Sequence, residues 1–234
     1  GEIERRTVMG LLNVDESKIR YTPLPLGRAA ADQYTEKMNR EYDWMSRVYD
    51  LFMFIFPRWK VWIRSVLPHI VGSEILEVSF GPGYLLTRYA TKSYYRVSGI
   101  DFNKRMVALA QKKMSKLGAM VELRQGKVEQ LPYDDASFDT VINTMAFTGY
   151  PDGDRALAEM KRVLRHGGRL LLVDFDYPKN RNRAGYWLVR FAEKVGDIVK
   201  DIGAALDRAG FAYEDRAIGG FGSVHLFICT KKDD

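Results

Sequence analysis

The chain has 234 residues, of which 46% are hydrophobic and 28% are charged, and its formal net charge is +6. This composition is ordinary for a globular protein and excludes a disordered, collagen-like or coiled-coil chain. The single cysteine excludes an internal disulfide and a cysteine-rich metal cluster, so we expect no metal. Basic residues come only in short stretches, and we therefore expect no nucleic-acid partner.

Neither a leader peptide nor a membrane span is predicted. The first ten residues, GEIERRTVMG, lack the apolar stretch of a signal peptide. The longest apolar run covers residues 51–56 and is far shorter than a membrane span. We therefore expect a cytoplasmic protein.

Residues 1–72 predict an N-terminal helical cap, or lid, that precedes the main domain. Residues 29–49 contain good helix formers and no helix breaker, so they predict a long helix. Residues 58–70 predict a second helix, because their apolar side chains recur at helical spacing. Pro57 fits the first turn of this second helix.

Residues 73–234 predict an α/β domain, because short strand patterns alternate with helical ones. The expected strands cover residues 74–79, 96–101, 120–124, 138–143, 169–175, 211–218 and 224–230. The expected helices cover residues 84–91, 103–117, 154–164 and 185–209. Only a glycine-rich connection joins the last two strands, which must therefore pair antiparallel. The sequence thus predicts a Rossmann-like, mostly parallel seven-stranded sheet with a C-terminal antiparallel hairpin strand.

The segment EVSFGPG at residues 77–83 carries the strongest local signal for a ligand site. It follows the first strand, at the carboxyl edge where open α/β sheets bind ligands. Gly81 and Gly83 let the main chain approach a ligand closely and turn into a helix. Asp101 ends the second strand, 24 residues after Glu77, at the spacing of an acidic residue that binds ribose hydroxyls. Together these residues predict an adenosine-containing ligand.

Two features favour S-adenosylmethionine over NAD as this ligand. The dinucleotide pattern requires a third glycine three residues after Gly83, and this position holds Leu86. Glu77 would also repel a pyrophosphate, whereas S-adenosylmethionine carries an ammonium and a sulfonium group and no phosphate. An NAD-dependent oxidoreductase stays open as an alternative.

The run from Glu77 to Asp176 resembles the class I S-adenosylmethionine-dependent methyltransferases, in particular the ubiquinone/menaquinone biosynthesis C-methyltransferases. The matching segments are EVSFGPG, VSGIDFNKRMVALAQ, GKVEQLPYDDASFDTVIN and ALAEMKRVLRHGGRLLLVDFDYP. The resemblance implies an enzyme that uses S-adenosylmethionine and releases S-adenosylhomocysteine. The cofactor-binding residues that it implies are Tyr49, Glu77, Gly81, Gly83, Asp101, Phe102, Met106, Val128, Glu129, Asn143 and Thr144.

Within this set, the resemblance places Asp101 on the ribose hydroxyls and Phe102 and Met106 against the adenine. The backbone N–H of Val128 and the side chain of Glu129 would meet the adenine edge. Glycines and polar residues from the other strand ends would line the methionine part and the reacting methyl group.

Three positions depart from the family pattern, and one of them, His166, stands in a turn where a proline is common. The other two lie in the motifs for the cofactor. Ser79 stands where the first glycine of the loop is usual, and Lys127 stands where an acidic or amide residue usually precedes the adenine contact. These departures leave open a binding module that retains S-adenosylmethionine or S-adenosylhomocysteine without turnover.

The acceptor is a small molecule whose identity the motifs do not fix. Residues near the ends of sheet-domain elements and in the basic segment after them are expected to contact it: Tyr150, Asp174, Asp176 and Trp187. Aromatic residues concentrate in residues 42–62. They are consistent with an apolar lid over an aromatic or lipophilic acceptor and equally with side chains that only pack the helices onto the sheet. Arg58, Lys60 and Arg64 beside them are compatible with peripheral contact to a membrane. A phospholipid or amine N-methyltransferase, the general base and the oligomeric state stay open.

Overall fold

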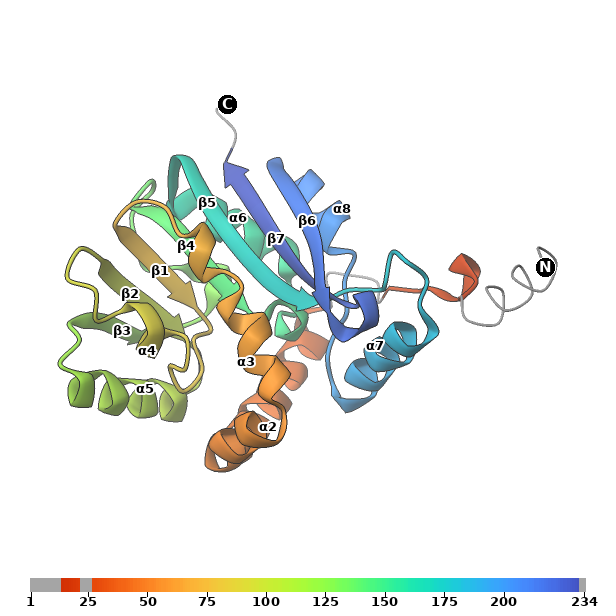
Figure 1. Ribbon diagram of the computed structural model, residues 1–234, viewed down its shortest axis with the longest axis horizontal. Coiled ribbons are helices and arrows are strands. Elements are labelled where there is room, and N and C mark those ends of the chain that lie inside the picture. The colour runs from red at the N-terminus through yellow and green to blue at the C-terminus, as the bar shows by residue number, and fades with distance from the viewer. Residues whose placement is uncertain (1–13, 22–26, 232–234) are drawn as a thin grey trace.

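The computed structural model describes residues 14–21 and 27–231, without the side chains of residues 16, 28 and 42–53. Seven strands form one sheet in the order β3-β2-β1-β4-β5-β7-β6 (Figure 1). Their bounds are β1 Glu74–Val78, β2 Arg96–Asp101, β3 Val121–Gln125, β4 Phe138–Thr144, β5 Leu164–Phe175, β6 Phe211–Gly219 and β7 Val224–Lys231. The first five strands are parallel, and β7 pairs antiparallel with β5 and β6. The expected fold class is confirmed.

Side chains alternate between the two faces of the sheet along each strand. Both faces of the interior strands are apolar, and helices cover both. The helices are α2 Arg28–Ile55, α3 Pro57–Arg64, α4 Leu86–Tyr89, α5 Lys104–Leu117, α6 Gly153–Val163, α7 Arg183–Val195 and α8 Ile202–Arg208. In the interior strand β5, Leu170 and Leu172 face the core beneath α6 and α8. Leu171 and Val173 face the opposite core, beneath α3, α4, α5 and α7.

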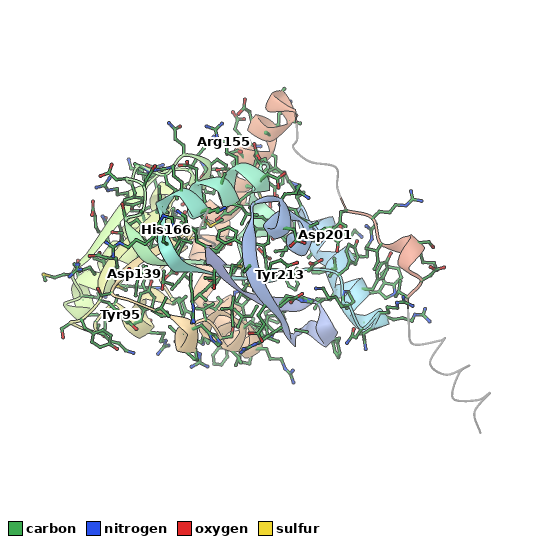
Figure 2. The ribbon with its side chains drawn as sticks, turned by 90° about the horizontal axis from the view of Figure 1, so that it is seen from above. Tyr95, Asp139, Arg155, His166, Asp201 and Tyr213 are labelled. Carbon is green, nitrogen blue, oxygen red and sulfur yellow. The ribbon has the colours of Figure 1, made fainter. Side chains whose placement is uncertain are left out.

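The amino end of β1 is fixed by a carboxylate on its neighbour β4. Asp139 (Figure 2) accepts hydrogen bonds from the backbone N–H groups of Ser73 and Glu74 at 2.9 and 3.0 Å. The same carboxylate forms an ion pair with Arg165. These contacts connect the start of β1 to β4 and β5 at the amino end of β1.

The expected helix over residues 185–209 is wrong, because the chain forms two helices there. Gly196 ends α7 with a φ of 121°, a backbone conformation that is rare for residues other than glycine. Asp201 then begins α8 by accepting the backbone N–H of Ala204. A glycine and a capping aspartate together interrupt an otherwise regular apolar pattern.

Other boundaries also differ from the expected ones; for example, α4 is shorter than the expected helix 84–91, and β5 begins five residues before the expected strand 169–175. The first long helix extends six residues further, to Ile55, and α3 ends at Arg64 before a separate 3-10 turn, Leu67–His69, that contains a proline. The helix expected over residues 154–164 ends at Val163, and the two glycines at 167–168 lie within β5. A Cβ at Gly168 would lie 3.1 Å from the Asp139 carbonyl oxygen, so close pairing with β4 explains this glycine.

Helix α2 is attached to the domain at two points. Asn39 Oδ1 accepts a hydrogen bond of 2.8 Å from the side chain of Asn103 at the start of α5. The hydroxyl of Tyr34 donates to the carbonyl oxygen of Gly196 at the end of α7. In the part of the chain that the structure describes, α2 and the other helices lack the combined length and apolar character of a membrane span.

Candidate functional site

A cavity of about 780 Å³ opens at the carboxyl ends of β1, β2 and β4. Helices α2 and α3 contribute to its walls through Met38, Trp59 and Ile63. This volume is typical of a site for a small organic ligand. Eight of the expected cofactor-binding residues line it, namely Glu77, Gly81, Asp101, Phe102, Met106, Val128, Glu129 and Thr144.

The loop after β1 owes its shape to three residues with positive φ. Ser79, Gly81 and Gly83 have φ angles of 53°, 54° and 79°. A Cβ on Gly81 would meet no atom within 4 Å, so this residue borders open space. A Cβ on Gly83 would lie 3.0 Å from the Cβ of Ala110, and Gly83 does not line the cavity. Gly81 therefore gives a ligand access to the backbone, while Gly83 allows the loop to pack against α5.

Asp101 links this loop to the end of β2. Its Oδ2 accepts the backbone N–H of Gly81 at 2.8 Å, and its Oδ1 accepts the backbone N–H of Asn103 at 2.9 Å. Burial raises the pKa of the Asp101 carboxyl to about 6, against the lowering effect of these two hydrogen bonds. Each oxygen retains a further lone pair, so the carboxylate can accept hydrogen bonds from a ligand in the cavity.

Glu77 is the second buried carboxyl group at this edge, and only 1% of its surface is exposed. Its Oε2 accepts a hydrogen bond of 2.8 Å from the hydroxyl of Tyr89. Burial raises the pKa of Glu77 to about 8, and the nearby charge of Asp101 acts in the same direction. At pH 7 Glu77 is therefore mostly protonated, and a cation bound in the cavity would favour its ionised form.

A chain of three polar side chains joins the ends of β1 and β4. The hydroxyl of Tyr150 lies 2.7 Å from Ser79 Oγ and accepts a hydrogen bond of 2.6 Å from Asn143 Nδ2. Asn143 is fully buried behind this contact and does not line the cavity, whereas Tyr150 and Thr144 do. Burial raises the pKa of Tyr150 well above its usual value, so its phenol stays protonated and cannot act as a base near neutral pH.

The far wall of the cavity follows β2 and the 3-10 turn Val128–Gln130. Phe102 and Met106 line it together with Val128 and Glu129. Burial raises the pKa of the Glu129 carboxyl. Lys127 is exposed and also lines this wall, so the departure from the family pattern lies directly beside the expected adenine contact.

Three of the residues expected to contact the acceptor do not line the cavity. Asp174 is fully buried and accepts hydrogen bonds from the backbone and the hydroxyl of Thr148. Asp176 accepts a hydrogen bond from the hydroxyl of Tyr21. Trp187 is 63% exposed on α7. Tyr49 has its side chain outside the described part of the structure.

Several residues at the cavity had no clear signal in the sequence. Asp32 and Thr35 come from α2, while Asp152 and Arg155 (Figure 2) come from the start of α6. Asp152 caps α6 by accepting the backbone N–H of Arg155 at 3.0 Å. A capping pattern indicates where a helix begins but gives no indication that the helix start lies at a ligand site.

The comparisons with known proteins agree with this geometry. Residues 76–172 match the family model described as a methyltransferase domain. The chain is 41% identical over 128 residues to the phthiotriol/phenolphthiotriol dimycocerosates methyltransferase of Mycobacterium leprae, which covers 53% of this chain and 44% of that protein. It is 29% identical over 142 residues to the ubiquinone/menaquinone biosynthesis C-methyltransferase UbiE of Geotalea uraniireducens, covering 59% and 60% of the two chains.

The alignments thus span about half the length of these two curated relatives. A solved structure of a SAM-dependent methyltransferase from Aquifex aeolicus has the same fold, with a TM-score of 0.56 and 20% identity. The similarity covers 71% of this chain and 88% of that one. The resemblance to class I S-adenosylmethionine-dependent methyltransferases, including their ubiquinone/menaquinone branch, is confirmed.

The link between β1 and β4 gives a prediction about stability. Tyr150→Phe removes the hydroxyl that bonds Ser79 and Asn143, and a buried polar group left without a partner costs about 1–3 kcal/mol of unfolding free energy. Urea denaturation measures this loss. The matched control is Tyr84→Phe, because the buried hydroxyl of Tyr84 has no hydrogen-bond partner among the described residues. Equal stability losses in the two variants would contradict the assigned link.

Proposed function

We propose that this chain is an S-adenosylmethionine-dependent methyltransferase that transfers the methyl group directly to a small aromatic or lipophilic acceptor. The observation that carries the proposal is the pair of buried carboxyls, Glu77 and Asp101, beside a glycine that borders open space. Residues 73–234 would form the donor-binding domain, and residues 1–72 would form the helical cap over it.

The residues present fit S-adenosylmethionine better than a dinucleotide. The ammonium and sulfonium groups of S-adenosylmethionine would favour the ionised form of Glu77, whereas the pyrophosphate of NAD would be repelled by that form and would find no cationic partner in Glu77. Ser79 adopts a φ of 53°, the backbone conformation that a glycine would supply, and its hydroxyl bonds Tyr150. This geometry supports a loop that is open to the donor although the first glycine is missing.

Each wall of the cavity would then hold a different part of the donor. Asp101 would accept hydrogen bonds from the ribose hydroxyls, next to the backbone of Gly81 that it already holds. Phe102 and Met106 would flank the adenine. The adenine edge would meet Val128 and Glu129. The methionine part would extend towards the ends of β1 and β4, where the expected residues Glu77, Asn143 and Thr144 lie.

When bound, S-adenosylmethionine supplies an electrophilic methyl group, which is transferred when the acceptor atom lies in line with the sulfur. The task of this chain is to hold both partners in that geometry and to exclude water. Tyr150 fits this task, because its protonated phenol is fixed between Ser79 and Asn143 at the cavity wall.

The acceptor side of the cavity is apolar and aromatic. Met38, Trp59 and Ile63 of the helical cap line the cavity together with Met145 and Tyr150. The curated relatives reported above are named for phthiotriol dimycocerosates and for ubiquinone/menaquinone biosynthesis, which supports a lipophilic acceptor. A quinol or a phenolic lipid combines both chemical characters.

The role of Asp101 predicts how donor binding depends on pH. Asp101→Asn should weaken S-adenosylmethionine binding about 10- to 100-fold, the effect of losing hydrogen bonds to a charged group. Below about pH 6, where the Asp101 carboxylate becomes protonated, the wild-type affinity should fall more steeply than the ionisation of Glu77 alone requires, and the variant should lack this additional decline. Calorimetric titration measures both effects. The control is Asp134→Asn, an exposed aspartate outside the cavity, and a matching loss there would contradict the role of Asp101.

The proposed reaction predicts turnover, which a binding module would lack. With radiolabelled S-adenosylmethionine, the methyl group should appear in quinol or phenolic acceptors more rapidly than in amines. Phosphatidylethanolamine serves as the test of an N-methyltransferase. Donor binding without label transfer to any member of this panel would contradict the enzymatic proposal and favour the module.

A further inference from the structure

Large apolar side chains are exposed mainly in one region of the described structure. Eleven of them are prominently exposed, and eight of these lie in the segments around α3, α7 and the turn after β6. Their exposed fractions run from 54% to 78%. These eight residues form what we term the α3–α7 surface: Phe54, Ile55, Phe56, Val61, Trp187, Phe191, Val195 and Phe221. An exposed apolar concentration of this kind marks a contact surface.

The three segments are neighbours in the fold. The turn Gly220–Gly222 lies between α3 and α7, because Gly219 approaches the ring of Trp62 and Gly220 approaches Leu188. Figure 1 shows α3 and α7 on the same, lower side of the sheet, with this turn between them. The exposed residues of α7, at positions 187, 191 and 195, recur every fourth residue and so form one stripe along the helix.

The charges around the α3–α7 surface are predominantly positive. Residues 54–64 (FIFPRWKVWIR) contain three basic residues and no acidic one. Helix α7 contains Arg183, Arg190 and Lys194, and its single acidic residue, Glu193, pairs with Arg190. Apolar side chains within a cationic frame complement an anionic lipid surface, which offers both an apolar interior and negatively charged head groups.

Helix α3 connects this surface with the cavity. Its inner face contributes Trp59 and Ile63 to the cavity wall, while Val61 points outward and is 57% exposed. The inner and outer faces of α3 are separated by the width of one helix, about 10–12 Å with side chains. The helix is only eight residues long, so its ends are close as well. A lipophilic molecule that leaves a bilayer at the outer face of α3 would therefore have only a short distance to travel around the helix to the cavity.

We propose that the α3–α7 surface docks the protein onto anionic phospholipid bilayers. The apolar side chains enter the interface between head groups and acyl chains, and the basic residues of α3 and α7 contact the head groups. Docking itself is independent of methyl transfer. Delivery of a lipophilic acceptor from the bilayer to the cavity is the part that rests on the proposed function.

The test measures binding to vesicles by co-sedimentation. The full chain should bind vesicles that contain phosphatidylglycerol in phosphatidylcholine, bind pure phosphatidylcholine more weakly, and dissociate as salt is added. Arg58→Ala/Arg64→Ala should weaken binding roughly fivefold per side chain, the equivalent of about 1 kcal/mol for each basic residue at an anionic surface. Lys112→Ala/Lys116→Ala on α5 is the matched control and should leave binding unchanged.

The apolar contribution is tested separately. Trp187→Ser/Phe191→Ser should weaken binding on the order of tenfold or more, because two large side chains no longer leave water. Trp187→Phe, which keeps an aromatic side chain, should bind nearly as well as the wild type. The control Met120→Ser removes another exposed apolar residue and should have no effect. Unchanged binding of S-adenosylhomocysteine shows that each variant remains folded.

Three outcomes would overturn the docking proposal. The first is a wild-type chain that does not co-sediment with anionic vesicles. The second is equal losses in the α3–α7 and control variants, which would indicate unspecific attraction by net charge. The third is a wild-type dimer that Trp187→Ser/Phe191→Ser dissociates, since a second copy would then cover the surface. Vesicle binding by a chain that fails to transfer methyl groups would support docking and contradict only the proposed function.

Discussion

Two acidic side chains, Glu77 and Asp101, are buried at the carboxyl ends of neighbouring parallel strands, although burial disfavours their charged forms. Within the described residues, the groups that act on their pKa values are hydrogen-bond donors and a second carboxyl, with no lysine or arginine among them. Buried charges of this kind are usually paired. A cationic ligand in the cavity would supply the missing partner, and this requirement connects the fold to the proposed donor.

The surrounding structure is arranged around this pair. Asp101 holds the loop after β1 through the N–H of Gly81, and its other oxygen orders the start of α5 through Asn103. Asn103 in turn bonds Asn39, so the same corner attaches the long helix α2 that forms a cavity wall. On the other side of β1, the contact between Ser79 and Tyr150 ties in the end of β4. Hydrogen bonds on both sides of β1 therefore connect the cavity walls that α2, β2 and β4 contribute.

The sequence predicted the sheet and eight of the residues that line the cavity, because local patterns determine both. Alternating strand and helix signals indicated a mostly parallel sheet. The positions of Glu77, Gly81 and Asp101 at or just after strand ends placed them at one edge of that sheet. Positions that depend on distant packing were not accessible in this way. The break between α7 and α8 depends on the backbone angle of Gly196 and on the cap at Asp201. Asp174 lies near the end of its strand, as Asp101 does, but it is bonded to Thr148 and fully buried. The cavity residues Asp32 and Arg155 reach the site only through the docking of their helices.

The most direct test of the carboxyl pair is the proton balance of donor binding. S-adenosylmethionine is titrated calorimetrically at pH 7 in two buffers of different ionisation enthalpy. Glu77 has a pKa of about 8 before binding and should ionise beside the bound cation, so about one proton should be released per donor. Glu77→Gln should abolish this release. Donor binding without proton release in the wild type, or the same release in the variant, would contradict the account.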